Sequence, residues 1–259
     1  MRPANRRPPL PAILLVLLLP LLALLSAASC DRGSSGPQAA RSPQEAVAQP
    51  AAPAPAATAP AAPPRQPANV MPFHGAAWLE REGRVEEERP DEVLQAMDLA
   101  PGMQVAEVGA GTGFFARRIG PVVAPGGKVY AVDIQAEMLD LLREYSARDG
   151  VDNVVPVLGT EVDPKLPRGA IDRLLLVDVY HEFQQPAPML QRMRESLAPG
   201  GRVVLVEYRA EDDSAAHIKA DHRMTVDQVL AEWLPAGFEL VERRETLPSQ
   251  HLFVFRARP

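Results

Sequence analysis

The chain has 259 residues, of which 46% are hydrophobic and 23% are charged, and its formal net charge is −6. The negative charge is concentrated after residue 70, because positions 71–259 hold 21 basic and 31 acidic residues, a formal charge of −10. A surface of that sign repels phosphate backbones, so nucleic acid is not an expected partner.

Residues 1–30 have the layout of an export signal. A start with three arginines is followed by an apolar run over positions 10–25 and then by small residues that lead to Cys30, the only cysteine of the chain. The ending AASC resembles a bacterial lipoprotein signal, which implies acylation of Cys30, although that family usually has Leu where Ala27 stands. Ordinary cleavage near Ala28 and an uncut anchor therefore remain alternatives.

Residues 31–70 differ from the rest of the chain in composition. Prolines account for 9 of these 40 residues and alanines for 13, and large apolar side chains are few. Such a segment cannot bury enough surface to offset the entropy of folding, so we expect a disordered linker. The folded domain is expected at 71–259.

In that domain, short apolar runs alternate with helical patterns. Near-continuous apolar runs of this kind are typical of parallel strands buried on both faces. Strands are expected at 103–108, 128–134, 153–158, 170–179 and 202–208, and helices around 138–145 and 189–197. The alternation predicts an α/β fold with a doubly wound, mostly parallel sheet.

The last 35 residues break the alternation. Thr225 and Gln228 have the spacing of a helix capping box. Two strand patterns then follow in succession, at 238–245 and 251–258. We expect them to form an antiparallel hairpin at the sheet edge, which completes a sheet of seven strands.

The sequence VAEVGAGTGFF, residues 105–115, is expected to be a strand that breaks into a glycine turn before a helix. Open α/β sheets bind ligands at such a position. The dinucleotide fingerprint G-x-G-x-x-G requires a sixth-position glycine, where this chain has Phe114. The pattern is instead E-x-G-x-G-x-G, formed by Glu107, Gly109, Gly111 and Gly113.

This spacing resembles the first motif of class I S-adenosylmethionine-dependent methyltransferases. The resemblance continues in VYAVDI, which ends in Asp133 and Ile134, in IDRLLLVDVYHEF, and in LAPGGRVVLVEY. It covers about residues 90–210 and implies a methyltransferase of this fold with S-adenosylmethionine as its cofactor. A donor with an ammonium and a sulfonium also suits a pocket rich in acids.

The resemblance implies roles for individual residues. Glu107 is expected near the methionine moiety, beside the three glycines, and Asp133 at the ribose hydroxyls with Ile134 next to it. Glu161 or Asp163 is expected at adenine. A helix-capping acid is the structural alternative for Glu107, and a solvated strand end is the alternative for Asp133.

The fourth strand ends in DVYHEF, which the resemblance places beside the sulfonium. Asp178, Tyr180 and His181 are therefore the catalytic candidates, and Asp178 is also a candidate for cofactor binding. His181 has an ordinary pKa suited to a general base, but it could equally cap the next helix.

The methyl acceptor is expected to be a small molecule. Residues 71–82 and 217–224 hold aromatic, basic and histidine side chains that could cover the pocket. His217 and Asp221, four residues apart, could ligate a metal, but two or three ligands without a fourth do not make a site, so no metal is expected.

Two other functions remain open at this point. One is an NAD-dependent oxidoreductase, which also uses a strand, a glycine turn and an acid after the second strand. The other is a tethered nucleoside-binding module without catalysis. The arginines before the apolar run predict a membrane-anchored, periplasmic domain, separated from the cytoplasmic supply of S-adenosylmethionine. A misassigned start codon would make the protein cytoplasmic.

Overall fold

The computed structural model describes residues 66–259. The expected signal and most of the expected linker lie outside the described residues. Residues 66–70, which composition assigns to the linker, pack on the domain: Ala68 is buried, and its N–H donates to the carbonyl oxygen of His181 at 3.0 Å. None of the helices between residues 66 and 259 is long and apolar enough to cross a membrane.

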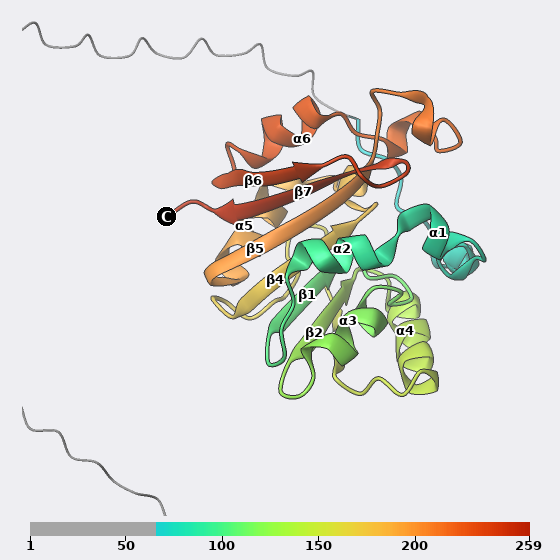
Figure 1. Ribbon diagram of the computed structural model, residues 1–259, viewed down its shortest axis with the longest axis vertical. Helices are drawn as coiled ribbons and strands as arrows, with labels where there is room; N and C mark the ends of the chain where they lie inside the picture. Colours follow the sequence, from blue (N-terminus) through green and yellow to red (C-terminus); the bar gives the residue numbers. More distant parts are fainter. Residues whose placement is uncertain (1–65) are drawn as a thin grey trace, which may run out of the picture. The chain divides into compact units, whose positions relative to one another are not determined.

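A seven-stranded sheet forms the centre of the domain, in the order β3-β2-β1-β4-β5-β7-β6 (Figure 1). The strands are β1 (Gln104–Val108), β2 (Lys128–Asp133), β3 (Val154–Leu158), β4 (Ile171–Val177), β5 (Leu197–Tyr208), β6 (Phe238–Arg244) and β7 (Gln250–Ala257). The first five are parallel to one another, and β7 runs antiparallel to both β5 and β6. The prediction of a doubly wound, mostly parallel sheet with an antiparallel C-terminal hairpin is confirmed.

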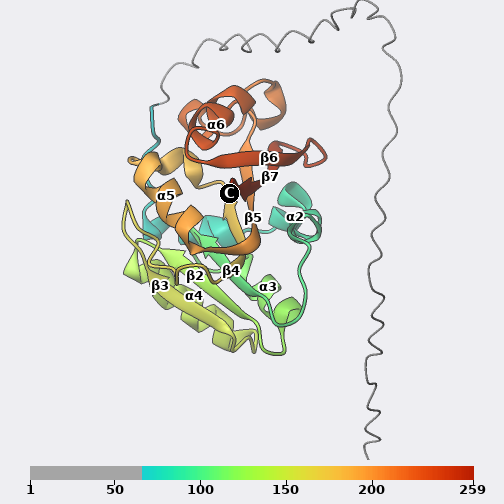
Figure 2. The ribbon, with the colours of Figure 1, turned by 90° about the vertical axis from the view of Figure 1, so that its left-hand side faces the viewer.

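Helices cover both faces of this sheet, as Figure 2 shows for α5 and α2. One core contains side chains of α2 (Pro90–Met97), α3 (Ala116–Val123) and α4 (Ala136–Arg148), and the other contains those of α5 (Pro186–Ser196) and α6 (Val226–Trp233). Neighbouring strand residues point to opposite faces, so Leu175 joins the first core while Leu174 and Leu176 join the second. This explains why the strands are apolar at nearly every position.

The capping box predicted from the sequence is present at the start of α6. The Thr225 hydroxyl accepts from the N–H of Gln228 at 3.1 Å, and the Gln228 side chain accepts from the N–H of Thr225 at 2.9 Å. Both donors would otherwise lack intrahelical partners, so the box fixes where α6 begins. It also fixes the end of the long connection that follows β5.

Helix α2 was not predicted from the sequence, and five short elements also add to the predicted pattern: η1 (Phe73–Glu80), α1 (Arg84–Glu88), η2 (Tyr180–Glu182), η3 (Asp213–Ala215) and η4 (Ala220–His222). Residues of η1, α1, η2 and η4 line a cavity with the ends of β1, β2 and β4. The 3-10 segments are too short for a periodic apolar pattern, which is why the sequence did not reveal them. Of these segments, η1, η2 and η4 lie at the carboxyl ends of the parallel strands, around the cavity.

Candidate functional site

A cavity of about 540 Å³ lies at the carboxyl ends of the central parallel strands. This is where open α/β sheets bind ligands, and the volume is in the range of small-molecule sites. Seven carboxylates line the cavity, whereas Arg84 and Lys219 are its permanent cations among the described residues. The cavity therefore suits a ligand with positive charge.

The glycine loop after β1 forms the floor of this cavity. Gly109, Gly111 and Gly113 have φ values of 76°, 51° and 81°, a region that favours glycine. A Cβ on Gly109 would lie 2.3 Å from the Val179 side chain, and one on Gly111 would lie 2.5 Å from that of Leu79. Gly109 and Gly111 line the cavity, whereas the space beside Gly113 is filled by Leu142 of α4.

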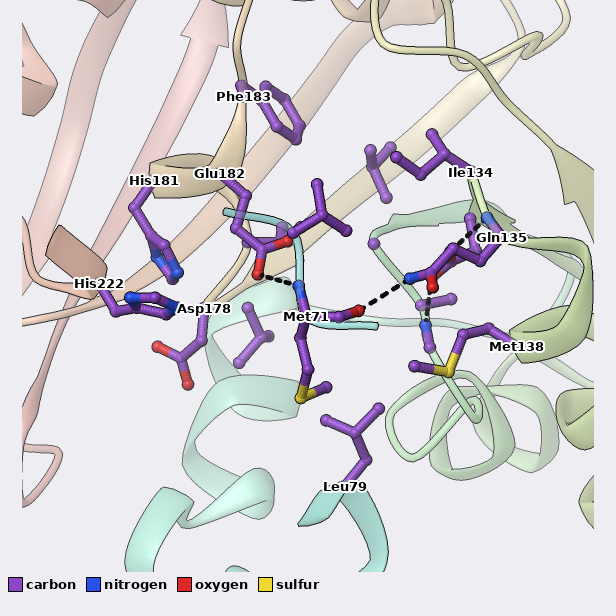
Figure 3. A pocket seen from close by; sticks show the side chains of 18 of the residues that line it. Met71, Leu79, Ile134, Gln135, Met138, Asp178, His181, Glu182, Phe183 and His222 are labelled. Atoms are coloured by element: carbon purple, nitrogen blue, oxygen red, sulfur yellow. Dashed lines mark hydrogen bonds between the residues drawn. The ribbon is translucent and has the colours of Figure 1, made fainter. Parts of the chain in front are cut away.

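Asp133 ends β2 at the edge of the same cavity. Its carboxylate accepts from the N–H of Gly111 at 2.8 Å and from the N–H of Gln135 at 2.9 Å. Burial raises the pKa of Asp133, and the backbone donors oppose that rise. The carboxylate is thus held in one orientation beside the glycine loop. Ile134, the next residue, also lines the cavity (Figure 3).

Glu107 lies on β1 beneath the glycine loop and is 3% exposed. Burial raises the pKa of Glu107 to about 8, against the opposing effect of the Arg84 and Arg117 guanidinium groups. Its Oε2 atom is buried and has no hydrogen-bond partner within residues 66–259. A buried carboxylate oxygen of this kind is costly unless a ligand or water pairs with it.

The two candidates for the adenine end differ in position. Glu161 is exposed and lines the cavity. Asp163 binds Lys165 instead, accepting from its backbone N–H at 2.8 Å and from its Nζ at 3.1 Å, and it is not part of the cavity lining. The structure therefore brings Glu161, and not Asp163, to the cavity.

Asp178 follows β4 in a left-handed conformation, with φ at 49°. Residues other than glycine are rarely found there, and such strain is concentrated at functional sites. The Asp178 carboxylate accepts from Gln250 Nε2 at 2.8 Å, while its Oδ1 has no partner in the described part of the chain. Burial, together with the neighbouring Glu88 and Glu207 carboxylates, raises the pKa of Asp178 well above its ordinary value.

The adjacent candidates Tyr180 and His181 point to different environments. The Tyr180 hydroxyl donates to Glu232 Oε2 at 2.6 Å, and its ring packs against Trp233, so Tyr180 belongs to the core under α6 and is not in the cavity lining. His181 does line the cavity. Its Nδ1 is 2.7 Å from Glu207 Oε2, so the ring is anchored to a buried acid of β5.

Sequence reasoning missed two acids beside His181. Glu207 is completely buried and also accepts from the N–H groups of Val179 and Tyr180, at 3.2 and 2.7 Å. An acid inside the apolar run VVLVEY was the signal that could have revealed it. Glu182 lines the cavity, and burial raises its pKa to about 7.

Residues 66–73, here called the strap, lie across the cavity. The Met71 N–H donates to Glu182 Oε1 at 3.0 Å, and the Met71 carbonyl accepts from Gln135 Nε2 at 2.9 Å (Figure 3). Gln135 also accepts from the N–H of Phe73 at 2.9 Å. Gln135 follows β2 and Glu182 follows β4, which flank β1 in the sheet, so the strap spans the end of β1.

The cavity is chemically suited to S-adenosylmethionine. Glu107 and Asp178 both line the cavity, and each has a buried carboxylate oxygen without a partner among the described residues, which suits an ammonium or sulfonium. Asp133 offers a carboxylate already oriented by two N–H groups. A nicotinamide dinucleotide would instead need a cluster of donors for its pyrophosphate.

Comparisons with known proteins agree with this chemistry. A family model described as a methyltransferase domain matches residues 99–245, more than half of the chain. The protein-L-isoaspartate O-methyltransferase of Aeropyrum pernix is 35% identical over 120 residues, which cover 44% of this chain and 42% of that protein. The ubiquinone/menaquinone biosynthesis C-methyltransferase UbiE of Coxiella burnetii is 28% identical over 111 residues, which cover 42% and 44%. The chain thus spans less than half the length of these relatives.

The fold has a counterpart among solved structures. A SAM-dependent methyltransferase from Aquifex aeolicus superimposes with a TM-score of 0.68 over 72% of this chain and 98% of that one, at 23% identity. The match of the family model over more than half of the chain decides against the oxidoreductase that the glycine turn alone left open. The chain belongs to the class I S-adenosylmethionine-dependent methyltransferases.

Proposed function

We propose that the protein methylates a small molecule that binds inside the cavity, on the side of Asp178 and His181. S-adenosylmethionine supplies a methyl group already activated by its sulfonium. Catalysis then depends mainly on alignment of the acceptor with that methyl group and on exclusion of water. Both tasks fall to residues that line the cavity.

The strap is the observation that carries the small-molecule assignment. Its backbone is tied to Glu182 on one side of the cavity and to Gln135 on the other. A residue on the surface of a folded protein would have to displace these hydrogen bonds to reach the end of β4. A small molecule can be enclosed beneath them.

We assign the donor-binding side of the cavity to the residues nearest the glycine loop. Asp133 accepts hydrogen bonds from the ribose hydroxyls in this proposal. Its carboxylate is held in place by two backbone N–H groups and has further lone pairs that can accept. Glu107 and Asp178 pair with the positive charge of the donor. We assign adenine to the exposed end of the cavity, beside Glu161.

The acceptor class can be tested with methyl-labelled S-adenosylmethionine and the full chain. Low-mass phenols, quinones, amines and carboxylates form one panel, and folded proteins with an isoaspartyl peptide form the other. We expect label transfer to members of the first panel only. Methylation of a protein or of the isoaspartyl peptide would refute the small-molecule acceptor, and donor binding without transfer to either panel would favour the non-catalytic module.

We also propose that the methyltransferase domain is tethered outside the cytoplasmic membrane through residues 1–30. The basic start, the apolar run and Cys30 support this location. The donor would then have to reach the periplasm, which makes the location a proposal separate from the activity. Protease accessibility in intact and permeabilised cells tests it, and protection in both would indicate a cytoplasmic protein.

A further inference from the structure

Three side chains with metal-ligating atoms meet at one wall of the cavity. They are His181 and Glu182 of η2 and His222 of η4, and their candidate ligand atoms all lie within 4.8 Å of one another. The two imidazole centroids are 5.0 Å apart, and Figure 3 shows the three side chains next to Asp178. The connection between β5 and α6 brings His222 to the end of β4, although the two histidines are 41 positions apart in the sequence.

Each of the three side chains is anchored by a second polar group. His181 Nδ1 lies 2.7 Å from Glu207 Oε2, and His222 Nδ1 lies 2.9 Å from Asp221 Oδ1. Glu182 accepts the Met71 N–H through Oε1. Metal-binding histidines characteristically donate their other ring N–H to a carboxylate or carbonyl, and ligating carboxylates are hydrogen-bonded in turn.

The anchoring also identifies the atoms that a metal would take. Since both imidazoles bind a carboxylate through Nδ1, their ligand atoms would be Nε2, and Glu182 would contribute Oε2. Ligand atoms around one transition metal are about 3 to 3.5 Å apart, given bonds of about 2.0–2.2 Å. Small side-chain rotations would therefore close the cluster on an ion.

We propose that His181, Glu182 and His222 bind one divalent transition-metal ion, such as Zn²⁺, with a coordination position open to the cavity. Two imidazoles and one carboxylate suit Zn²⁺ or Fe²⁺ and do not suit Mg²⁺ or Ca²⁺, which prefer all-oxygen sites. Three protein ligands with an open position are typical of catalytic metal sites. The expectation of no metal considered His217 and Asp221, whereas the structure groups His222 with two residues of η2.

This site rests on the proposed function and deepens it, because it selects acceptors with a hydroxyl that can coordinate the ion. Coordination lowers the pKa of a hydroxyl, so its proton leaves to solvent near neutral pH. The acceptor oxygen then forms the new bond to the methyl carbon, and the carbon–sulfur bond breaks with its electron pair on sulfur. His181 thus acts as a ligand here, and the alternative is that it removes the proton itself as a base oriented by Glu207.

Metal binding can be measured without donor or acceptor. The full chain is stripped with a chelator and titrated with Zn²⁺ against a chromophoric competitor. We expect one equivalent per chain, with affinity at least tenfold lower in His222→Ala and in Glu182→Gln. His217→Ala is the matched control, because His217 lines the same cavity and packs against Tyr208 outside the cluster.

Co²⁺ substitution provides a second readout, because the d–d absorption of the bound ion depends on its ligands. We expect the wild-type spectrum in His217→Ala and its loss in His222→Ala. No stoichiometric binding by the wild type, or unchanged binding by His222→Ala and Glu182→Gln, would overturn the metal site. If methyl transfer to a low-mass acceptor persists in that case, the methyltransferase proposal stands and His181 acts as the base. Stoichiometric Zn²⁺ binding without transfer to any low-mass acceptor would instead count against the proposed function alone.

Discussion

The carboxylate of Asp133 accepts a 2.8 Å hydrogen bond from the backbone N–H of Gly111, which joins the end of β2 to the glycine loop after β1. Asp133→Asn should therefore weaken donor binding. The amide has one acceptor oxygen where the carboxylate has two, so the variant cannot accept from both backbone N–H groups and also from the ribose hydroxyls, and one hydrogen bond to the donor is lost. We expect a cost of about 1–3 kcal/mol, roughly 5- to 150-fold in the dissociation constant measured by calorimetry.

Asp140→Asn is the matched control for this substitution. Asp140 lies on the exposed side of α4 and pairs with Arg143 at 2.6 Å. Exposed pairs of this kind contribute little, so its donor affinity should equal that of the wild type. Equal affinity in Asp133→Asn would remove Asp133 from the donor site.

Gly109→Ala should destabilise the protein more than the same substitution at a glycine that also has a positive φ but has open space beside it. Its φ is 76°, and the new Cβ would meet the stiff, β-branched Val179 at 2.3 Å. Backbone strain and overpacking together should lower the free energy of unfolding by about 2–4 kcal/mol, as measured by urea denaturation.

Gly102→Ala separates the two contributions. Gly102 has a φ of 90°, but a Cβ there would meet nothing within 4 Å. Gly102→Ala should therefore lower the free energy of unfolding only through backbone strain, by about 1 kcal/mol. The double substitution Gly109→Ala with Val179→Ala should be less destabilised than the sum of its parts, and strict additivity would show that Val179 is not the obstacle.

The fold could be predicted because its signals are local and repeated. Apolar runs fixed the positions of the strands to within one or two residues for β1, β2 and β3, and the Thr225 capping box identified the start of α6. The strap, residues 66–73, carries no such pattern. Its position depends on single hydrogen bonds from Met71 and Phe73 to residues more than 60 positions away, which periodicity does not encode.

The side of the cavity that we propose for the donor was predictable from the sequence, and the side that we propose for the acceptor was less so. Glu107 and Asp133 lie at the carboxyl ends of β1 and β2, and the glycines follow β1, so their common edge of the sheet follows from the parallel topology. Beyond β4 the chain turns through η2, and neighbours in sequence diverge: His181 faces the cavity while Tyr180 enters the core beneath α6. Adjacency in the sequence cannot determine that direction.

Cys30→Ser tests the proposed anchor. If Cys30 is acylated, the full chain expressed in a bacterial host should incorporate labelled fatty acid and partition into the detergent phase. The serine variant lacks the thiol and should do neither. If the variant associates with the membrane without label, residues 1–30 act as an uncut anchor. If the wild-type protein is soluble, both the acylated Cys30 anchor and the uncut anchor are contradicted.

The buried Glu107 should make stability depend on pH in an unusual direction. Its pKa in the folded protein is raised from 4.5 to about 8, so between these values the folded state holds a proton that the unfolded state has lost. Stability then falls as pH rises, by up to about 1.4 kcal/mol per unit from this group, with no contribution to the slope below pH 4.5 or above pH 8.

Glu107→Gln removes this titration while preserving the shape of the side chain. Urea denaturation of the donor-free protein at several pH values should show the variant gaining stability over the wild type as pH rises from 5 to 8.

Bound donor should make the wild type the more stable of the two proteins, because a bound cation favours the ionised carboxylate. Donor binding to the wild type near pH 7 should therefore release a proton. Calorimetry in buffers of different ionisation enthalpy measures that release, which should be smaller in the variant. Parallel stability curves, or equal proton release, would show that Glu107 is ionised in the free protein and does not face the positive charge of the donor.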